Sequence, residues 1–391
     1  MLRLLVAVML LGGIAQAQWV MQDSGTTASL RGVHYVGEGV VWASGTGGTV
    51  LRTVDMGKSW QKCAVPPGAE KLDFRGLQAF DAKTALVMSS GKGDLSRLYK
   101  TTDGCATWTL MATNPEKDGF WDSVRSPLPE FTEESPASSA LVLGDAVNGR
   151  TQIWEWKEGW GERELELTKL APLRTDGKEG SFAASNSVLQ TALGAQTDKT
   201  WKFEFWWASN ASGKSYISFH RVESTAACEP CRAESGQVAL PVFANGSSSG
   251  VFSFGFRSQK AGVAVGGDYQ HENFRDHVAA WSSDAGLTWK AAKTDPGGYR
   301  SAVAYSEKLK TWITVGPNGT DASFDDGRNW QALEPGLKDV EGADRGWNAL
   351  SLPFVVGAKG RIGLLREATV TSARKGYEME KADRAKAKKK K

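Results

Sequence analysis

Seven polar side chains stand at equivalent positions in seven similar stretches of the chain. Three of them are arginines, and a guanidinium makes planar, two-pronged hydrogen bonds with a carboxylate or a phosphate. If folding brings the positions together, we expect a ring that binds an anion. The positions are Arg31, Arg75, Asp122, Asn186, Ser253, Arg300 and Asn348. Three neighbouring residues complete the candidate binding set, namely Glu179, Asp268 and Tyr299.

The alternative for these residues is structural. Each arginine could pair with a nearby acid, such as Asp122, Glu179 or Asp268, and join neighbouring repeats. The sequence leaves both roles open, because an arginine and an acid suit an internal ion pair as well as a ligand.

Other motifs that could carry chemistry are incomplete. The loop from Asp268 to His277 contains metal-ligand residue types, but it lacks the HExxH spacing of a zinc helix. The run from Gly45 to Gly48 lacks the Lys-Ser/Thr pair and the helix of a phosphate-binding loop. No dinucleotide-binding fingerprint is present. We therefore expect neither a metal nor an organic cofactor.

A short motif recurs four times and indicates which structure supports the ring of polar residues. Its pattern is Ser/Thr-x-Asp-x-Gly-x-Thr-Trp, with glycine one residue earlier in the second copy and asparagine replacing threonine in the fourth. The aspartate can hold a tight turn, the glycine supplies positive φ, and the indole can fill the gap to the next sheet. Four copies predict an array of structural hairpins. Their residues are Asp55, Gly57, Trp60, Asp103, Trp108, Asp284, Gly286, Trp289, Asp325, Gly327 and Trp330.

The spacing of the repeats predicts an all-β fold. Most units are about 45 residues long, which is typical of propeller blades. Each unit begins with a run that carries one polar position, and most continue with a glycine-rich strand and a third strand. Four units end in the motif hairpin, whereas the third and fourth units are longer and lack a clean copy. Four strands make a blade, and seven units make a seven-bladed β-propeller over residues 18–369. The first strand of each blade lines the channel, so the polar positions should meet at one mouth.

The seventh unit lacks the motif, and the start of the chain supplies what is missing. Residues 18–23 match the strand that follows the motif in other units. We expect this N-terminal strand to complete the last blade, because closure removes free sheet edges.

The two ends of the chain differ from the repeats. Residues 1–17 have the pattern of a signal peptide, with Arg3, an apolar run and Ala15-Gln-Ala17, so we expect cleavage before Gln18 and export to the periplasm or beyond. The alternative is an uncleaved anchor, although the run is shorter than the roughly 18–20 residues that span a bilayer.

The net charge is +3, yet residues 374–391 hold nine basic and three acidic residues. We predict a disordered basic tail over residues 370–391 that could touch a membrane surface, and no binding to nucleic acid.

Four cysteines in an exported chain can pair. Cys228 and Cys231 are close enough for a local disulfide in a hairpin and are the first candidates. Cys63 and Cys105 each lie beside a repeated motif in adjacent units and could also pair. Free thiols remain the alternative. No histidine accompanies either pair, so a zinc site is not expected.

Several runs beyond the motif resemble a known family. The segments 45–52, 182–186, 266–269 and 298–301 are similar to a secreted bacterial family of β-propellers with Asp-box, or bacterial neuraminidase, repeats. That family is related to the photosystem II stability/assembly factor of plants and cyanobacteria, and the resemblance covers residues 18–366. It implies a structural role for the boxes at the rim. It also implies a non-enzymatic assembly function that uses an arginine-bearing surface.

The repeated motif also resembles that of sialidases, which are glycoside hydrolases. Sialidases hold a sugar carboxylate with three arginines and use a tyrosine nucleophile, a helper glutamate and an acid/base aspartate. Residues of these types are present as Tyr35, Tyr269, Tyr299, Glu179 and Asp122. However, the Phe-Arg-Ile-Pro-type motif is absent, and seven units replace six. We therefore expect a monomeric, non-catalytic scaffold that holds a protein client or an anionic ligand.

Overall fold

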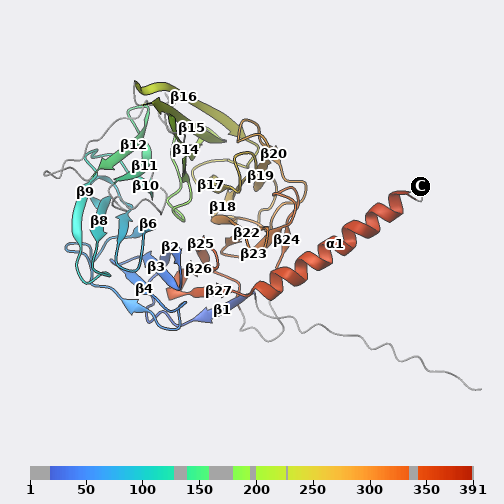
Figure 1. The fold of residues 1–391 in the computed structure, drawn as a ribbon, viewed down its shortest axis with the longest axis horizontal. Helices are drawn as coiled ribbons and strands as arrows, with labels where there is room; N and C mark the ends of the chain where they lie inside the picture. The colour runs from blue at the N-terminus through green and yellow to red at the C-terminus, as the bar shows by residue number, and fades with distance from the viewer. Residues whose placement is uncertain are drawn as a thin grey trace, which may run out of the picture.

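Seven antiparallel sheets surround a common axis (Figure 1). The computed structural model describes residues 18–126, 139–157, 179–193, 200–225, 228–333 and 342–389. Six sheets have four strands, and the third shows three strands within these ranges. The sheets follow one another around the axis in chain order. The predicted seven-bladed β-propeller is therefore confirmed.

The first four blades account for residues up to the middle of the chain. Blade 1 contains β2 (Leu30–Gly37), β3 (Val40–Gly45), β4 (Val50–Thr53) and β5 (Gln61–Lys62). Blade 2 contains β6 (Phe74–Ala79), β7 (Ala85–Ser89), the 3₁₀ turn η1 (Gly93–Leu95), β8 (Arg97–Thr101) and β9 (Thr109–Thr113). Blade 3 contains β10 (Trp121–Arg125), β11 (Ser139–Val147) and β12 (Arg150–Lys157). Blade 4 contains β13 (Leu189–Leu193), β14 (Thr200–Ala211), β15 (Lys214–Thr225) and β16 (Cys228–Leu240).

The last three blades complete the ring. Blade 5 contains β17 (Ser249–Phe256), β18 (Gly262–Asp268), β19 (Ala279–Ser282) and β20 (Lys290–Ala291). Blade 6 contains β21 (Ala302–Ser306), β22 (Thr311–Gly316), β23 (Gly319–Ser323) and β24 (Gln331–Ala332). Blade 7 contains β25 (Trp347–Ser351), β26 (Phe354–Gly357), the 3₁₀ turn η2 (Ala358–Gly360), β27 (Ile362–Leu365) and β1 (Trp19–Gln22).

The hydrophobic core lies between neighbouring sheets. The buried indole of Trp42 in blade 1, for example, belongs to one cluster with Leu77 and Tyr99 of blade 2. Inner strands approach closely where glycine leaves room. A Cβ atom on Gly76 would lie 2.9 Å from Val124 Cγ1 of the next blade, so a side chain there would push two blades apart. This dense packing fixes where the first strand of each blade presents its side chains.

The four repeated motifs form the same hydrogen-bonded turn. In the first copy, Asp55 accepts bonds from Thr53 Oγ1 at 2.7 Å, Ser59 N at 3.0 Å and Ser59 Oγ at 2.6 Å. Thr53 Oγ1 in turn accepts a bond from Gly57 N at 3.1 Å. The same pattern recurs around the aspartates of the other three copies. The motif therefore fixes the connection between the third and fourth strands of a blade.

Backbone geometry explains why the glycine can shift by one position in the second copy. Two successive residues of each turn have positive φ, as in Met56 at 62° and Gly57 at 76°. In the second copy these residues are Gly104 at 74° and Cys105 at 70°. Glycine removes strain at either position, so one glycine is enough.

The N-terminal strand closes the ring as predicted. Strand β1 pairs antiparallel with β27, and Trp19 lies opposite Leu365. The Trp19 side chain is only 3% exposed, and its Nε1 donates to Thr320 Oγ1 at 3.0 Å. Gln18 Nε2 donates to the carbonyl of Leu333 at 2.8 Å. The strand therefore connects blade 7 to blade 6 as well as completing blade 7.

A disulfide joins Cys63 of blade 1 to Cys105 in the turn of blade 2, with a Cα–Cα distance of 5.3 Å. This is the second of the two pairings that the sequence left open. The side chains of Cys228 and Cys231, the first candidate pair, lie outside the described residues, as does the expected signal peptide at 1–17.

We expect the change Cys63→Ser together with Cys105→Ser to lower the free energy of unfolding by about 2–4 kcal/mol, because the bond closes a loop in the unfolded chain. The two cysteines are 42 residues apart. Urea denaturation with and without a reducing agent measures the effect. Reduction should destabilise the parent chain and leave the double variant unchanged; equal behaviour of the two proteins would contradict the expectation.

The end of the chain differs from the prediction of a disordered tail over residues 370–391. Residues Glu367–Lys389 form one helix, α1, which extends away from the propeller (Figure 1). The prediction of disorder rested only on the charge of this segment. It overlooked Val370, which is 1% exposed in the core between blades 6 and 7, and the helix-favouring alanines that follow. Within the described residues, no helix has the length and apolarity needed to cross a membrane.

Candidate binding site at the mouth of the central channel

A cavity of about 570 Å³ opens at one mouth of the channel. It is lined by residues from most of the blades, which the ring closure brings to one place although they are far apart in sequence. The lining includes four of the predicted residues and an aromatic side: Arg31, Arg75, Tyr299, Asn348, Phe182 and Tyr269. The candidate site therefore lies where the first strands of the blades begin.

Arg31 is a half-buried cation that forms no ion pair with an acid among the described residues. Its Nε is buried, and no described residue forms a hydrogen bond with this atom. Burial lowers the pKa of Arg31, and the nearby positive charge of Arg75 lowers it further, while Asp73 and Tyr299 oppose that change. A guanidinium that lacks a bonded partner and faces another cation favours a bound anion over solvent.

Arg75 is partly neutralised by its surroundings. Its Nε contacts Asp73 Oδ2 at 2.8 Å, and its Nη1 donates to the carbonyl of Ala183 at 3.3 Å. The second bond reaches from blade 2 to the segment that leads into blade 4. Asp73 thus compensates one of the two guanidiniums. The two arginines and Asp73 together carry one positive charge, and the acids Asp145 and Glu272 line the same cavity.

Beside the arginines lies a pair of carboxyl groups. Asp122 is completely buried on β10 and faces Asp145, which lines the cavity. If both groups were ionised, neither oxygen of Asp122 would have a donor. Burial raises the pKa of Asp122 well above its usual range, with a further contribution from Asp145, and burial also raises the pKa of Asp145. A proton held between the two carboxyls satisfies this geometry.

The pH dependence of stability should report this shared proton. Because the native pKa of Asp122 lies well above the ordinary aspartate pKa of about 3.9, the folded chain holds the proton more tightly, and stability falls as pH rises from about 4 through the native pKa. We expect Asp122→Asn to resemble the parent near pH 4 and to exceed its stability by at least about 1 kcal/mol at pH 8. Urea denaturation at pH 4, 6 and 8 checks this, with exposed Asp94→Asn as the control. A difference that does not grow with pH would contradict it.

The other side of the cavity is aromatic. The rings of Phe182 and Phe252 are stacked with centroids 3.7 Å apart. Tyr269, which is 45% exposed, meets both rings edge-on at 6.4 and 6.2 Å. Tyr299 packs against Phe252 at 4.6 Å. The site thus combines a cationic side with a wall that can cover an apolar group.

A second cavity continues the site outward. It has a volume of about 410 Å³ and shares Asp145, Ser181 and Phe182 with the first. The remaining lining comes from small and polar residues around the starts of β15 and β17, such as Ser212, Gly213 and Ser249. The two cavities adjoin at the residues that they share, so an extended ligand could contact both.

Arg300 was placed in the ring by sequence, but it does not line the cavity. Its Nε donates to Asp321 Oδ2 at 2.7 Å, and both side chains are 2% exposed. The guanidinium also donates to the carbonyl of Tyr299 at 2.9 Å and to Asn318. The expected triad is therefore a pair, and Arg300 takes the structural role that the sequence left open. It turns inward because β23 of its own blade offers a buried carboxylate.

Two other ring residues join blades to one another. Asn186 accepts a bond from Val124 N at 2.8 Å and donates to the carbonyl of Leu77 at 2.9 Å, so it connects blades 2 and 3 to the entry of blade 4. Ser253 Oγ accepts bonds from Ser187 Oγ at 2.7 Å and Val303 N at 2.9 Å. Asn186 lines a separate cavity of about 400 Å³ and not the candidate site.

The remaining predicted residues divide between the cavity and the scaffold. Asn348 lines the cavity, and its Nδ2 donates to the carbonyl of Leu30 at 2.8 Å across the seam between blades 7 and 1. Asp268 accepts bonds from Gln270 N at 2.9 Å and His271 Nδ1 at 2.8 Å and supports its own loop. Glu179 is buried and accepts bonds from Ser209 and from Gln237 at 3.1 Å.

Two residues of the expected sialidase-like set, Glu179 and Tyr299, are not brought together in one cavity. Glu179 belongs to the interior of blade 4 and does not line the cavity that contains Tyr299. Burial raises the pKa of the Tyr299 phenol, which disfavours the phenolate needed for attack. Among the described residues, no three His, Cys, Asp or Glu side chains are grouped so that they could hold a metal ion. The geometry therefore suits binding better than this hydrolysis.

Several site residues were missed from the sequence. Asp73 directly precedes the second run, and Asp145 directly follows the glycine that ends the small-residue strand of blade 3. Their positions at strand ends were the available signal. Phe182 heads the fourth run, but its aromatic partner Phe252 lies 70 residues away in blade 5, so only the fold joins them.

Comparisons with known proteins bear on the fold. No protein-family model matches the chain, and no curated protein matches it. Solved propellers do. The structure described as "YCF48 bound to D1 peptide" matches with a TM-score of 0.51 and 15% identity over 89% of this chain and 97% of that one. YCF48 from Cyanidioschyzon merolae matches with a TM-score of 0.52 and 15% identity over 90% and 99%.

A bacterial sensor domain gives a similar result. The extracellular domain of the putative hybrid two component system BT4673 from B. thetaiotaomicron has a TM-score of 0.52 and 12% identity, over 90% of this chain and 40% of that one. These likenesses establish the propeller fold. At such low identity they identify no ligand.

Proposed function

We propose that this chain is a non-catalytic binding scaffold that holds a segment of a protein client, through an anionic group, at the channel mouth. The observation that carries the proposal is the unpartnered Arg31 guanidinium beside Arg75 in an open cavity with an aromatic side. A structural neighbour is described as bound to a D1 peptide. By analogy, we infer that this mouth also accepts a stretch of polypeptide.

The chemistry of the two cavities narrows the client. Arg31 and Arg75 suit a carboxylate, the Phe182–Phe252 wall suits an adjacent apolar side chain, and the adjoining cavity past Asp145 suits an extended backbone. We further propose that the chain is exported as a monomer after cleavage at Ala17, and the Cys63–Cys105 bond agrees with an oxidising compartment.

The repeated turns have a supporting role in this proposal. We propose that the four motifs are Asp-box hairpins and that the protein is related to assembly factors of the photosystem II type. The hydrogen bonds of the motif aspartates Asp55 and Asp284 are used within their own turns. Asp325 of the fourth motif also accepts a bond from Tyr377. They position the outer strand and leave ligand binding to the channel mouth.

The change Arg31→Met tests the proposal because it removes the charge and retains the length of the side chain. We expect about 10- to 100-fold weaker capture of the client, since one charge-assisted hydrogen bond contributes about 1.5–3 kcal/mol. Affinity capture from an extract of the native exported fraction, with quantitative mass spectrometry, measures it. The exposed Lys58→Met variant is the matched control, and thermal melting verifies folding. Equal capture by both folded variants would reject this surface.

A further inference from the structure

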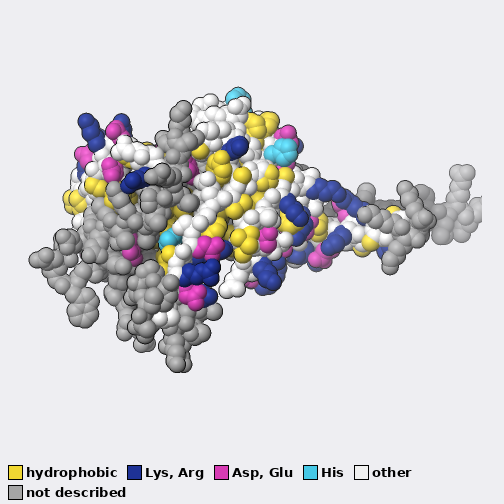
Figure 2. All heavy atoms as spheres, turned by 90° about the horizontal axis from the view of Figure 1, so that it is seen from above, with side chains coloured by type: hydrophobic (Ala, Val, Ile, Leu, Met, Phe, Trp, Pro, Cys, Tyr) yellow, Lys and Arg dark blue, Asp and Glu magenta, His cyan; other side chains and the backbone are white. Residues whose placement is uncertain are grey.

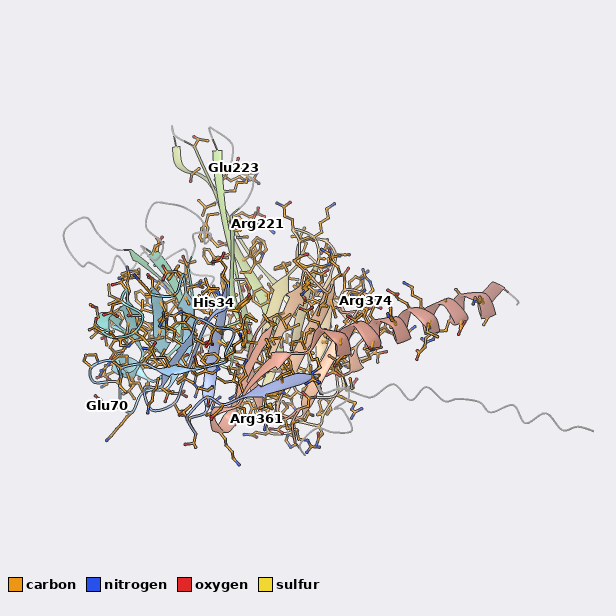
Figure 3. The ribbon with its side chains drawn as sticks, turned by 60° about the horizontal axis from the view of Figure 1, so that its bottom comes forward. His34, Glu70, Arg221, Glu223, Arg361 and Arg374 are labelled. Atoms are coloured by element: carbon orange, nitrogen blue, oxygen red, sulfur yellow. A yellow bond between two sulfur atoms is a disulfide. The ribbon has the colours of Figure 1, made fainter. Side chains whose placement is uncertain are left out.

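The root of helix α1 is fastened to blade 6. Arg374 Nη2 donates to the carbonyls of Leu309 at 2.7 Å and Lys310 at 2.5 Å and to Thr311 Oγ1 at 2.5 Å. Tyr377 Oη donates to Asp325 Oδ2 at 3.0 Å. Asp325 is the aspartate of the fourth repeated motif. Figure 3 shows Arg374 where the helix meets the sheet. The helix is therefore held in one direction by buried and hydrogen-bonded contacts up to Tyr377.

Beyond Tyr377 the helix leaves the propeller. Every residue from 378 to 387 is exposed, and Figure 2 shows the helix standing clear of the body with Lys and Arg side chains along its course. The only large hydrophobic side chain in this stretch is Met379, at 69% exposure. Such a segment has no apolar face with which to dock on another protein core or to insert among lipid chains.

The charge of this distal part is concentrated. Residues 378–391 contain seven basic and three acidic residues, and six of the seven cations are lysines. The acids are Glu378, Glu380 and Asp383. The segment contains no asparagine or glutamine, which pair with adenine, and no aromatic residue, which stacks on bases. Lysine is a point charge that makes no demand on the geometry of its partner, whereas arginine suits defined phosphate or base contacts. A diffuse anionic surface is the best match.

We propose that the distal half of α1, residues 378–389, binds the surface of a bilayer that contains anionic phospholipid. The attraction is electrostatic and reversible, because lysines near such a surface each contribute while no side chain inserts. The helix extends from the outer side of blade 6, away from the channel axis (Figure 1). The channel mouth therefore remains open to a client while the helix contacts lipid. Lipid binding by the helix does not depend on the function proposed for the mouth.

The experiment measures co-sedimentation of the full chain with vesicles of phosphatidylcholine alone or with 30% phosphatidylglycerol, at 0.1 M and 0.5 M salt. The distal variant replaces five basic residues of the helix with Gln: Lys381, Arg384, Lys386, Lys388 and Lys389. The matched control replaces five exposed lysines of the propeller with Gln: Lys58, Lys71, Lys117, Lys260 and Lys293.

We expect the parent and the control to bind the anionic vesicles at 0.1 M salt, and the distal variant to bind at least 100-fold more weakly. At 0.5 M salt, where the screening length falls to about 4 Å, the binding of the parent should be lost. Undiminished binding by the distal variant, equal binding to neutral vesicles, or no binding at 0.1 M salt would each overturn the proposal. Tighter binding to a 20-base-pair DNA duplex than to the anionic vesicles would assign the helix to nucleic acid instead.

Discussion

The change Asp321→Ala is expected to lower the free energy of unfolding by about 3–5 kcal/mol, because it leaves the charge of Arg300 buried without its partner. Arg300 and Asp321 are each 2% exposed, and Gly297 N also donates to Asp321 at 3.2 Å. The guanidinium would then keep only its bonds to the Tyr299 carbonyl and to Asn318. Urea denaturation at neutral pH, followed by tryptophan fluorescence, measures the loss.

A double variant separates the lost pair from the lost volume. Replacing both residues, as Arg300→Met with Asp321→Leu, removes both charges and should recover most of the stability lost by Asp321→Ala. If Asp321→Ala cost less than about 1 kcal/mol, or if the double variant were the less stable of the two, the buried pair would not have the role assigned to it.

The change Trp19→Ala should be nearly as costly, at about 3–5 kcal/mol, because it removes the main anchor of the closing strand. The indole is 3% exposed, lies 5.8 Å from the Trp347 ring and donates a hydrogen bond to Thr320. Without it, the N-terminal segment keeps the bond from Gln18 to Leu333 as its contact with blade 6, and the edge of β27 becomes more available. Thermal melting and urea denaturation measure the effect, and light scattering detects association through the freed edge.

The same strand provides the control for this prediction. Met21 lies two residues further along β1 and is 40% exposed. We expect Met21→Ala to change stability by less than about 0.5 kcal/mol. If Trp19→Ala lowered the free energy of unfolding as little as Met21→Ala, the strand would be held by its backbone bonds alone and the indole would be dispensable.

The fold could be predicted because its signals are local and repeated. Each motif sets its own turn through the bonds of one aspartate, such as Asp55, so four copies give four independent indications. The match between residues 18–23 and the other motif strands also predicted that β1 pairs with β27. The helix at Glu367–Lys389 was missed because its docking depends on Val370 and Tyr377, whose partners lie on blade 6.

The candidate site was predicted only in part, because its geometry depends on which way side chains turn. Sequence placed Arg31, Arg75 and Arg300 at equivalent positions, yet Asp321 on β23 draws the third one inward. The position of a residue on a strand follows from the repeat. Its hydrogen-bond partner comes from another strand or another blade, as for Asp122 and Asp145, and a repeat pattern does not specify that choice.

The central claim is that the channel mouth, and not the rim, meets the client. Photo-cross-linking tests it most directly, with p-benzoylphenylalanine in place of Phe182, which lines both cavities, or in place of Leu110, which is 46% exposed on β9. The account predicts cross-linked client from the Phe182 position, its loss when Arg31→Met is added, and none from Leu110. Cross-links from Leu110 that equal or exceed those from Phe182 would contradict it.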